Sequence, residues 1–146
     1  MNEDLTAKAN VTIHAPIAKV WDALVNPQVI KRYMFGATAV SDWKEGSPIA
    51  WKGEWKGKPF EDKGRILELR PEKRLRYSHF SPLSGAPDKP ENYHQVTIDL
   101  SKQEDREDAV RLDLSQDNNK TKEARDESRR NWAMMLEAIK RAVEQS

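Results

Sequence analysis

The spacing of the apolar residues changes once along this chain, and that change most limits how the chain can fold. Between residues 37 and 116, apolar side chains recur mostly at every second position, which is the period of a half-buried strand. From about Thr121 to Glu144 the spacing becomes three to four, and this segment contains no glycine or proline. The sequence therefore predicts several consecutive strands followed by one long helix.

Turn residues divide the period-two stretch into six expected strands. A seventh is expected near the beginning of the chain, where apolar and polar residues alternate in the segment AKANVTI. Short turns between consecutive strands indicate antiparallel pairing, and residues 56–59 are interpreted as one of these turns. The expected strands cover residues 7–13, 37–43, 49–55, 63–70, 74–80, 93–100 and 110–116.

Two short helices are expected after the first strand. Pro16 begins the first, because a proline at the first helical position loses no hydrogen bond, and residues 26–27 end it. The second covers residues 28–33 and stops at Gly36.

The final helix is the one expected element that is long enough to cover a sheet. Its ~24 residues would measure ~36 Å at ~1.5 Å per residue. Only its later two-thirds has a clear apolar stripe, which consists of Trp132, Met135, Leu136, Ile139 and Val143. A sheet that wraps around this helix leaves a cavity wherever side chains fail to fill the space between them.

The composition favours one folded domain over residues 1–146. The net charge is +1, and five Trp, three Tyr and three Phe argue against disorder. The sequence has no cysteine, which excludes disulfides, thiolate metal sites and a cysteine nucleophile. No apolar run approaches the ~18 residues of a membrane span, and the first ten residues lack the order of a signal peptide. We therefore expect a cytoplasmic protein without a membrane span.

Six stretches, which together cover nearly the whole chain, resemble a known superfamily in their order and spacing. They are VTIHAPIAKVWDALVNP (11–27), SDWKEGSPIAWKGEWKGK (41–58), DKGRILELRPEKRLRYS (62–78), PENYHQVTIDLS (90–101), RLDLSQDNN (111–119) and NWAMMLEAIKRAVE (131–144). The resemblance is to the helix-grip superfamily of START lipid-transfer domains and Bet v allergens. Within it, the chain is most similar to the bacterial branch named after the activator of the heat-shock-protein-ninety ATPase.

The resemblance implies an α+β helix-grip fold, in which a curved, mostly antiparallel seven-stranded sheet wraps around the long C-terminal helix. It also implies a cavity between sheet and helix that takes a small hydrophobic molecule, aromatic or lipid-like, and a role in a stress response. No cofactor is implied. Because relatives include lipid carriers, polyketide cyclases and toxin-resistance proteins, the fold alone does not determine the function.

The candidate cavity-lining residues lie on the inward faces of the expected strands and the last helix. They are Trp51, Trp55, Tyr77, His79, Val96, Ile98, Leu112, Trp132, Met135 and Leu136, with Met34 and Phe35 at the cavity mouth. Gly53, between the two strand tryptophans, is expected to leave space for a ligand. A simpler alternative stays open: the strand tryptophans fill the core or face an interface, and the helix residues follow the spacing of any buried face.

His79 shares a strand face with Tyr77, so it is a candidate for orienting a polar ligand or acting as an acid and base. The alternative is a histidine near a strand end that is half exposed or bonded to the backbone. No catalytic residue is assigned. The three histidines are too scattered to predict a metal site, and the phosphate-loop, dinucleotide-binding and G-x-S-x-G motifs are absent from the sequence.

Residues 44–76 contain ten Lys and Arg against six Asp and Glu. Because the acidic residues are interleaved with the basic ones, we expect a solvated outer sheet face and no nucleic-acid partner. Two alternatives to ligand binding stay open. One is a polyketide cyclase- or hydrolase-like enzyme that uses His79. The other is a protein-interaction module that contacts a heat-shock chaperone through the outer face. The eukaryotic co-chaperone carries an additional amino-terminal domain, whereas this chain starts at its first expected strand, so chaperone contact is the weaker expectation.

Overall fold

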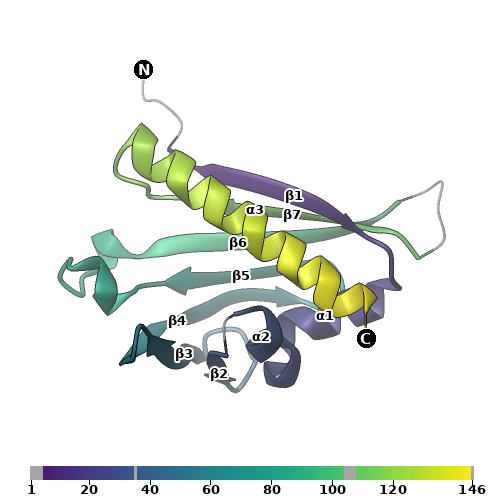
Figure 1. Ribbon diagram of the computed structural model, residues 1–146, viewed down its shortest axis with the longest axis horizontal. Helices are drawn as coiled ribbons and strands as arrows, with labels where there is room; N and C mark the ends of the chain where they lie inside the picture. The colour runs from purple at the N-terminus through teal and green to yellow at the C-terminus, as the bar shows by residue number, and fades with distance from the viewer. Residues whose placement is uncertain (1–4, 35, 104–107, 146) are drawn as a thin grey trace.

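The computed structural model describes residues 5–34, 36–103 and 108–145, excluding the side chains of Trp55 and Leu83. Within these residues, seven strands form one sheet in the order β1-β7-β6-β5-β4-β3-β2, and every neighbouring pair is antiparallel (Figure 1). The strands are β1 (Ala7–Ile13), β2 (Thr38–Ser41), β3 (Pro48–Trp55), β4 (Lys58–Arg70), β5 (Arg74–His79), β6 (His94–Lys102) and β7 (Val110–Gln116).

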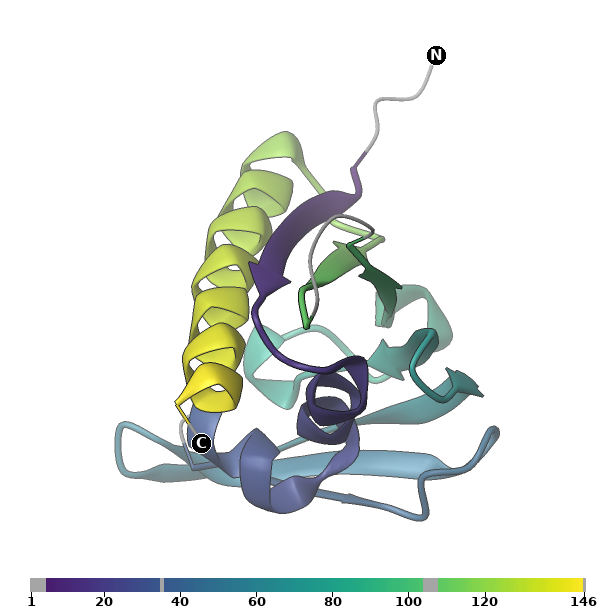
Figure 2. The ribbon, with the colours of Figure 1, turned by 90° about the vertical axis from the view of Figure 1, so that its right-hand side faces the viewer.

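Three α-helices cover one face of the sheet: α1 (Ile17–Val25), α2 (Pro27–Tyr33) and α3 (Lys122–Glu144). Helix α3 runs diagonally across this face, and the strands curve around it (Figures 1 and 2). Two 3-10 turns, η1 (Pro82–Ser84) and η2 (Pro90–Asn92), interrupt the connection between β5 and β6. This architecture confirms the predicted α+β helix-grip fold.

Local sequence signals determine where the helices begin. The Asn26 side chain accepts a hydrogen bond from the Gln28 amide at 3.0 Å, and Pro27 occupies the first position of α2. The Thr121 hydroxyl accepts one from the Ala124 amide at 3.0 Å and caps α3. No helix in the described ranges has the length and the apolar character that crossing a membrane requires.

The core lies between the sheet and the three helices. Its fully buried large side chains, at under 2% exposure, are Ile13, Ile66, Leu112, Leu136, Val20, Val96, Val110 and Val143. Burial of each such side chain contributes about 1.5–3 kcal/mol, so this packing is the main stabilising contribution that joins α3 to the sheet.

Strand β4 begins five residues earlier than the sequence analysis placed it. The turn expected at residues 56–59 contains only Lys56 and Gly57, whose φ angles of 52° and 81° are those of a tight two-residue hairpin. Pro59, expected in the turn, is the second residue of β4 and pairs with Glu54 of β3. Prolines are tolerated near the beginning of a strand because few ladder hydrogen bonds are lost there.

Gly64 lies where β4 is bonded on both sides. Strand β4 pairs with β3 as far as Arg65, and on its other side it bonds to Phe80 at Lys63 and pairs with β5 from Ile66, with a register shift between Ile66 and Glu68. A Cβ atom at Gly64 would lie 1.7 Å from the carbonyl oxygen of Ser78 on β5. Only a residue without a side chain permits this close approach of two backbones.

Two charged side chains of α3 hydrogen-bond to the backbone at the end of the edge strand β1. Lys140 Nζ donates to the Thr12 carbonyl oxygen at 2.7 Å and to Glu144 Oε2 at 2.6 Å. Glu144 Oε2 also accepts from the backbone amide of His14 at 2.7 Å. Partial burial alone would raise the pKa of Glu144, but the His14 amide and the Lys140 ammonium outweigh it and hold that pKa below its ordinary value.

We expect Gly64→Ala to lower the free energy of unfolding by about 3 kcal/mol, the upper end of typical overpacking, because the new methyl group meets backbone that must move. Gly85→Ala is the matched control, since its Cβ would meet no atom within 4 Å and only its φ of +80° is strained. The control should cost about 1 kcal/mol. Urea unfolding followed by tryptophan fluorescence measures both. Equal costs for the two variants would show that the Gly64 contact is not tight.

The contribution of Glu144 to stability should depend on pH. Because its pKa is lower in the folded protein than in the unfolded chain, the contribution is complete at neutral pH and is lost as the pH falls below the ordinary value of 4.5. Glu144→Gln should therefore be less stable than the wild type by about 1 kcal/mol at pH 7. The difference should shrink towards pH 3, as measured by urea unfolding at each pH. Glu137→Gln, an exposed change on the same helix, should follow the wild-type profile.

Candidate functional site

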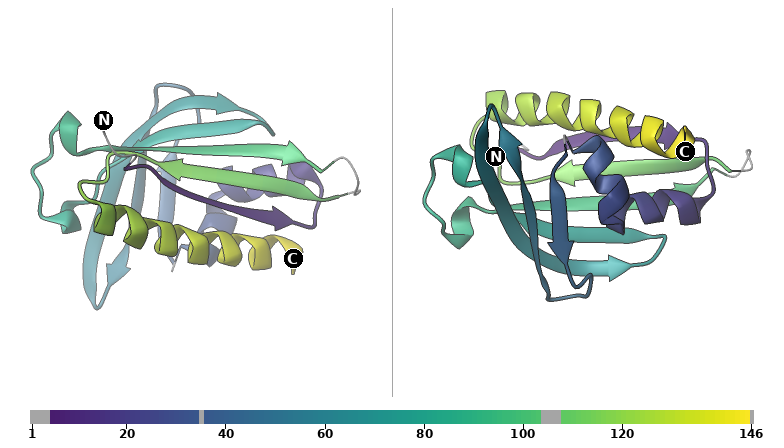
Figure 3. Two further views of the ribbon diagram at one scale, coloured as in Figure 1. Left: turned by 90° about the horizontal axis from the view of Figure 1, so that it is seen from above. Right: turned by 60° about the horizontal axis from the view of Figure 1, so that its bottom comes forward.

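A cavity of about 300 Å³ lies between strands β3–β5 and the first half of α3. Strands β3 and β4 reach this half of the helix because the sheet curves beneath it (Figure 3). Most of the wall is apolar or aromatic, with a few polar groups that converge on one side. The lining residues are Met34, Ala37, Trp51, Phe60, Asp62, Tyr77, His79, Gln116, Ser128, Asn131, Trp132 and Met135.

Three aromatic rings from two strands build one wall of the cavity. The centroid of Trp51 on β3 lies 5.1 Å from that of Tyr77 and 5.2 Å from that of His79, both on β5. The Trp51–His79 pair meets edge to face, which is a favourable arrangement of aromatic rings. Burial raises the pKa of the Tyr77 hydroxyl above its usual range, so this group stays neutral.

Asp62 and His79 form a polar pair in this aromatic surrounding. Asp62 Oδ2 lies 2.9 Å from Nε2 of His79, and their side chains are 18% and 29% exposed. The second carboxylate oxygen, Asp62 Oδ1, is buried and has no hydrogen-bond partner in the described part of the chain. A buried oxygen without a partner costs about 1–3 kcal/mol, so the pair stabilises the fold less than a fully hydrogen-bonded pair would.

Beneath the cavity is a second hollow of only about 30 Å³, roughly the volume of one water molecule. Trp51, Tyr77, Trp132 and Met135 line both spaces, and Ile98 lies at the lower one. The interior below the aromatic wall is therefore filled by side chains, and the space for a ligand lies towards the surface.

Polar contacts hold the first half of α3 over the cavity. The indole N–H of Trp132 donates a hydrogen bond to Gln116 Oε1 at the end of β7. The Ser128 hydroxyl donates to Asn119 Oδ1 at 3.0 Å, and the buried Asn119 amide donates to the Leu5 carbonyl at 2.7 Å. These bonds connect the helix to one end of the β1–β7 pair, where Ala7 lies opposite Gln116.

The structure gathers six of the sequence-predicted residues around the cavity: Met34, Trp51, Tyr77, His79, Trp132 and Met135. It places Val96, Leu112 and Leu136 in the packed core, where none of them lines either hollow. These three point inward as expected, but α3 and its neighbours leave no space beside them. Phe35 and the side chain of Trp55 lie outside the described residues. That the six residues bind a ligand stays a prediction.

Phe60 and Asp62 were not predicted as site residues, because the expected strand began only at residue 63, after an expected turn over residues 56–59. Both belong to the same alternating series as Ile66, so a strand extended back to residue 58 would have placed a carboxylate on the inward face. Gly53 does not leave open space as expected, because the ring of Phe60 lies 3.0 Å from where its Cβ would be.

An open groove of about 810 Å³ lies between β4–β6 and the loop 81–93, but it offers less for binding. Its principal charged groups satisfy one another: the Lys63 ammonium pairs with Asp88, and the Tyr93 hydroxyl donates to the same carboxylate at 2.7 Å. We therefore take the cavity beneath α3 as the candidate site.

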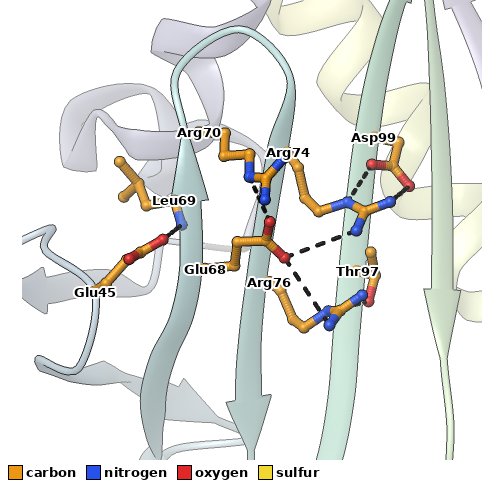
Figure 4. Close-up of polar contacts among 8 residues, drawn as sticks. All are labelled: Glu45, Glu68, Leu69, Arg70, Arg74, Arg76, Thr97 and Asp99. Atoms are coloured by element: carbon orange, nitrogen blue, oxygen red, sulfur yellow. Dashed lines mark hydrogen bonds and ion pairs between the residues drawn. The ribbon is translucent and has the colours of Figure 1, made fainter.

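The outer face of the sheet carries a network of paired charges (Figure 4). Glu68 accepts from Arg70 at 2.6 Å and lies 3.7 Å from Arg74 and 3.9 Å from Arg76. Arg74 also binds Asp99 at 2.6 Å. The basic excess expected from the sequence is thus balanced in part within the face itself. Contact with a chaperone through this face stays a prediction.

Comparison with known proteins gives a consistent relationship. The family model described as "Activator of Hsp90 ATPase homolog 1-like protein" matches residues 14–144. A protein from Cytophaga hutchinsonii, solved in solution, is 55% identical, with 99% of this chain and 97% of that chain covered and a TM-score of 0.85. No curated protein matches the chain.

Two more distant structures share the fold. The Aha1 dimer from Colwellia psychrerythraea is 20% identical, with 95% of this chain and 96% of that chain covered and a TM-score of 0.72. DynU16, a protein in the dynemicin biosynthetic locus, is 15% identical with a TM-score of 0.79. The alignment covers 97% of this chain and 48% of DynU16.

If the Asp62–His79 pair does not serve stability, an apolar replacement of both residues should be tolerated. We expect Asp62→Leu combined with His79→Leu to leave the free energy of unfolding unchanged or to raise it by about 1 kcal/mol, because two desolvated polar groups disappear together. Asp62→Leu alone should be less stable than the double variant. Urea unfolding at pH 7 measures all three proteins. A loss of more than about 2 kcal/mol in the double variant would assign the pair a structural role.

Proposed function

The chain belongs to the family of Activator of Hsp90 ATPase homolog 1-like proteins, and on that premise we propose that it binds a small hydrophobic molecule, aromatic or lipid-like, in the cavity beneath α3. The observation that carries the proposal is the cavity itself, which is walled by Trp51, Tyr77, Trp132 and Met135. A space of this kind, apolar with a few convergent polar groups, is typical of small-molecule sites.

The size and chemistry of the wall indicate what fits. A cavity of about 300 Å³ is at the small end of the usual ~300–1,000 Å³, which suits one or two fused rings. Binding would be driven by apolar burial, at roughly 25 cal/mol per Å². The flexible side chains of Met34 and Met135 can adjust to ligands of different outline.

One structural neighbour supports a small-molecule role. DynU16 is a protein in the dynemicin biosynthetic locus, and a biosynthetic locus handles small molecules. At 15% identity the likeness extends to the fold alone, and the ligand of this chain follows from its own residues.

Acid–base catalysis is a second candidate, favoured by the hydrogen-bonded Asp62–His79 pair beside the cavity. A carboxylate that orients an imidazole is a common general-base arrangement. This candidate predicts conversion of a bound ligand that depends on pH and is lost in His79→Ala. Chromatography of the recovered ligand tests for conversion. If the ligand is bound but unchanged, only the binding function is supported.

A larger side chain in the cavity should abolish binding. We expect naphthalene at 100 times its dissociation constant to stabilise the wild type by about 2.7 kcal/mol, which raises its melting temperature by several degrees. Met135→Trp fills part of the cavity and should lose this rise while remaining folded. Met134→Trp is the matched control, because Met134 is its neighbour and is 64% exposed, and it should keep the rise.

Thermal unfolding followed by circular dichroism measures both variants. An equal rise in the two, or none in the wild type with naphthalene or other one- and two-ring aromatic compounds, would contradict binding in this cavity.

A further inference from the structure

We propose that the ligand carries a hydroxyl group on its aromatic ring, as a phenol or naphthol does, and that the hydroxyl hydrogen-bonds to Nδ1 of His79. This inference rests on the proposed function, because it names the ligand class of the same cavity. The inference depends on the Asp62–His79 pair, because a cavity that bound only hydrocarbon would not need these two polar side chains in its wall.

The carboxylate of Asp62 determines which nitrogen of His79 is available. An ionised carboxylate only accepts hydrogen bonds, so Nε2, at 2.9 Å from Asp62 Oδ2, carries the proton of this bond. In the neutral imidazole the other nitrogen, Nδ1, is therefore an acceptor. No described residue bonds to Nδ1, and the ring lines the cavity. Asp62 thus acts as a positioning residue for an acceptor at the cavity wall.

A hydroxyl is the ligand group that suits this acceptor in either protonation state. With a neutral His79, the hydroxyl donates to Nδ1. With a protonated His79, Nδ1 donates and the same hydroxyl oxygen accepts. An ether oxygen can only accept, and a hydrocarbon can do neither. The aromatic part of such a ligand would lie against Trp51, whose centroid is 5.2 Å from the imidazole.

The Tyr77 hydroxyl is the competing partner for a polar ligand group. It also lines the cavity, and its ring centroid is 5.1 Å from that of Trp51. Among the described residues no carboxylate bonds to the Tyr77 hydroxyl, whereas Asp62 bonds to His79. We therefore assign the recognition of the hydroxyl to His79, and the experiment must separate the two residues.

Equilibrium dialysis with 2-naphthol, 2-methoxynaphthalene and naphthalene tests the proposal on the full chain. The three compounds share one ring system, and naphthol is intermediate in size between the other two, so size alone cannot favour it. We expect the wild type to bind 2-naphthol about tenfold more tightly than both others, the effect of one hydrogen bond to a fixed partner. The absorbance spectrum of bound 2-naphthol reports independently on how its proton is shared.

Variants assign the preference to residues. In His79→Phe the preference for 2-naphthol over the other two compounds should fall to about twofold or less, while naphthalene still binds. Asp62→Leu should also reduce this preference. His14→Gln is the matched control, because His14 is exposed and does not line the cavity, and it should keep the preference. If His79→Phe does not fold, His79→Leu replaces it.

The outcomes separate this inference from the proposed function. Equal affinity of the wild type for all three compounds overturns the hydroxyl preference but leaves cavity binding intact. No binding of any of the three overturns both. A preference that is lost in Tyr77→Phe and kept in His79→Phe overturns the assignment to His79.

Discussion

The close approach of β4 and β5 at Gly64 determines the shape on which the rest of the structure depends. Because no side chain separates the two backbones there, β4 can lie against the end of β5 while it still pairs with β3. The sheet curves so that β3 and the first part of β4 lie opposite the first half of α3 (Figure 3). A flatter sheet would leave this half of the helix without an opposing wall. The strands that wall the candidate site are thus packed together at a residue without a side chain.

Alternation along single strands was enough to predict much of the site. It placed Trp51 on one strand and His79 on another with the correct inward orientation, because the direction of a side chain in a strand depends only on position. It could not predict that His79 pairs with Asp62. That contact depends on how β4 pairs with β5, whose register shifts between Ile66 and Glu68, and alternation within one strand does not show it. The alternation of Asp62 itself was hidden because Pro59 resembles a turn residue.

The apolar stripe of α3 explains where the cavity lies. Ile139 and Val143, in the later part of the helix, pack into the core, whereas Ser128 and Asn131, in the earlier part, face the cavity. A polar helix surface over an apolar sheet cannot fill the space by packing, so the space remains. The missing stripe in the first third of the helix was visible in the sequence. The sequence did not show how completely side chains fill the core beside Leu112, because that depends on how closely the helix approaches the sheet.

The pairing of β1 has a consequence for the order in which the protein folds during synthesis. Strand β1 is made well before its ladder partner β7, and the α3 residues Lys140 and Glu144 that bond to its end are made later still. The ~100 residues between β1 and β7 take roughly 5–20 s to synthesise at ~5–20 residues per second. During this time β1 has no native ladder partner. The β1–β7 pair can therefore form only once β7 has been made, and the sheet cannot be completed before then.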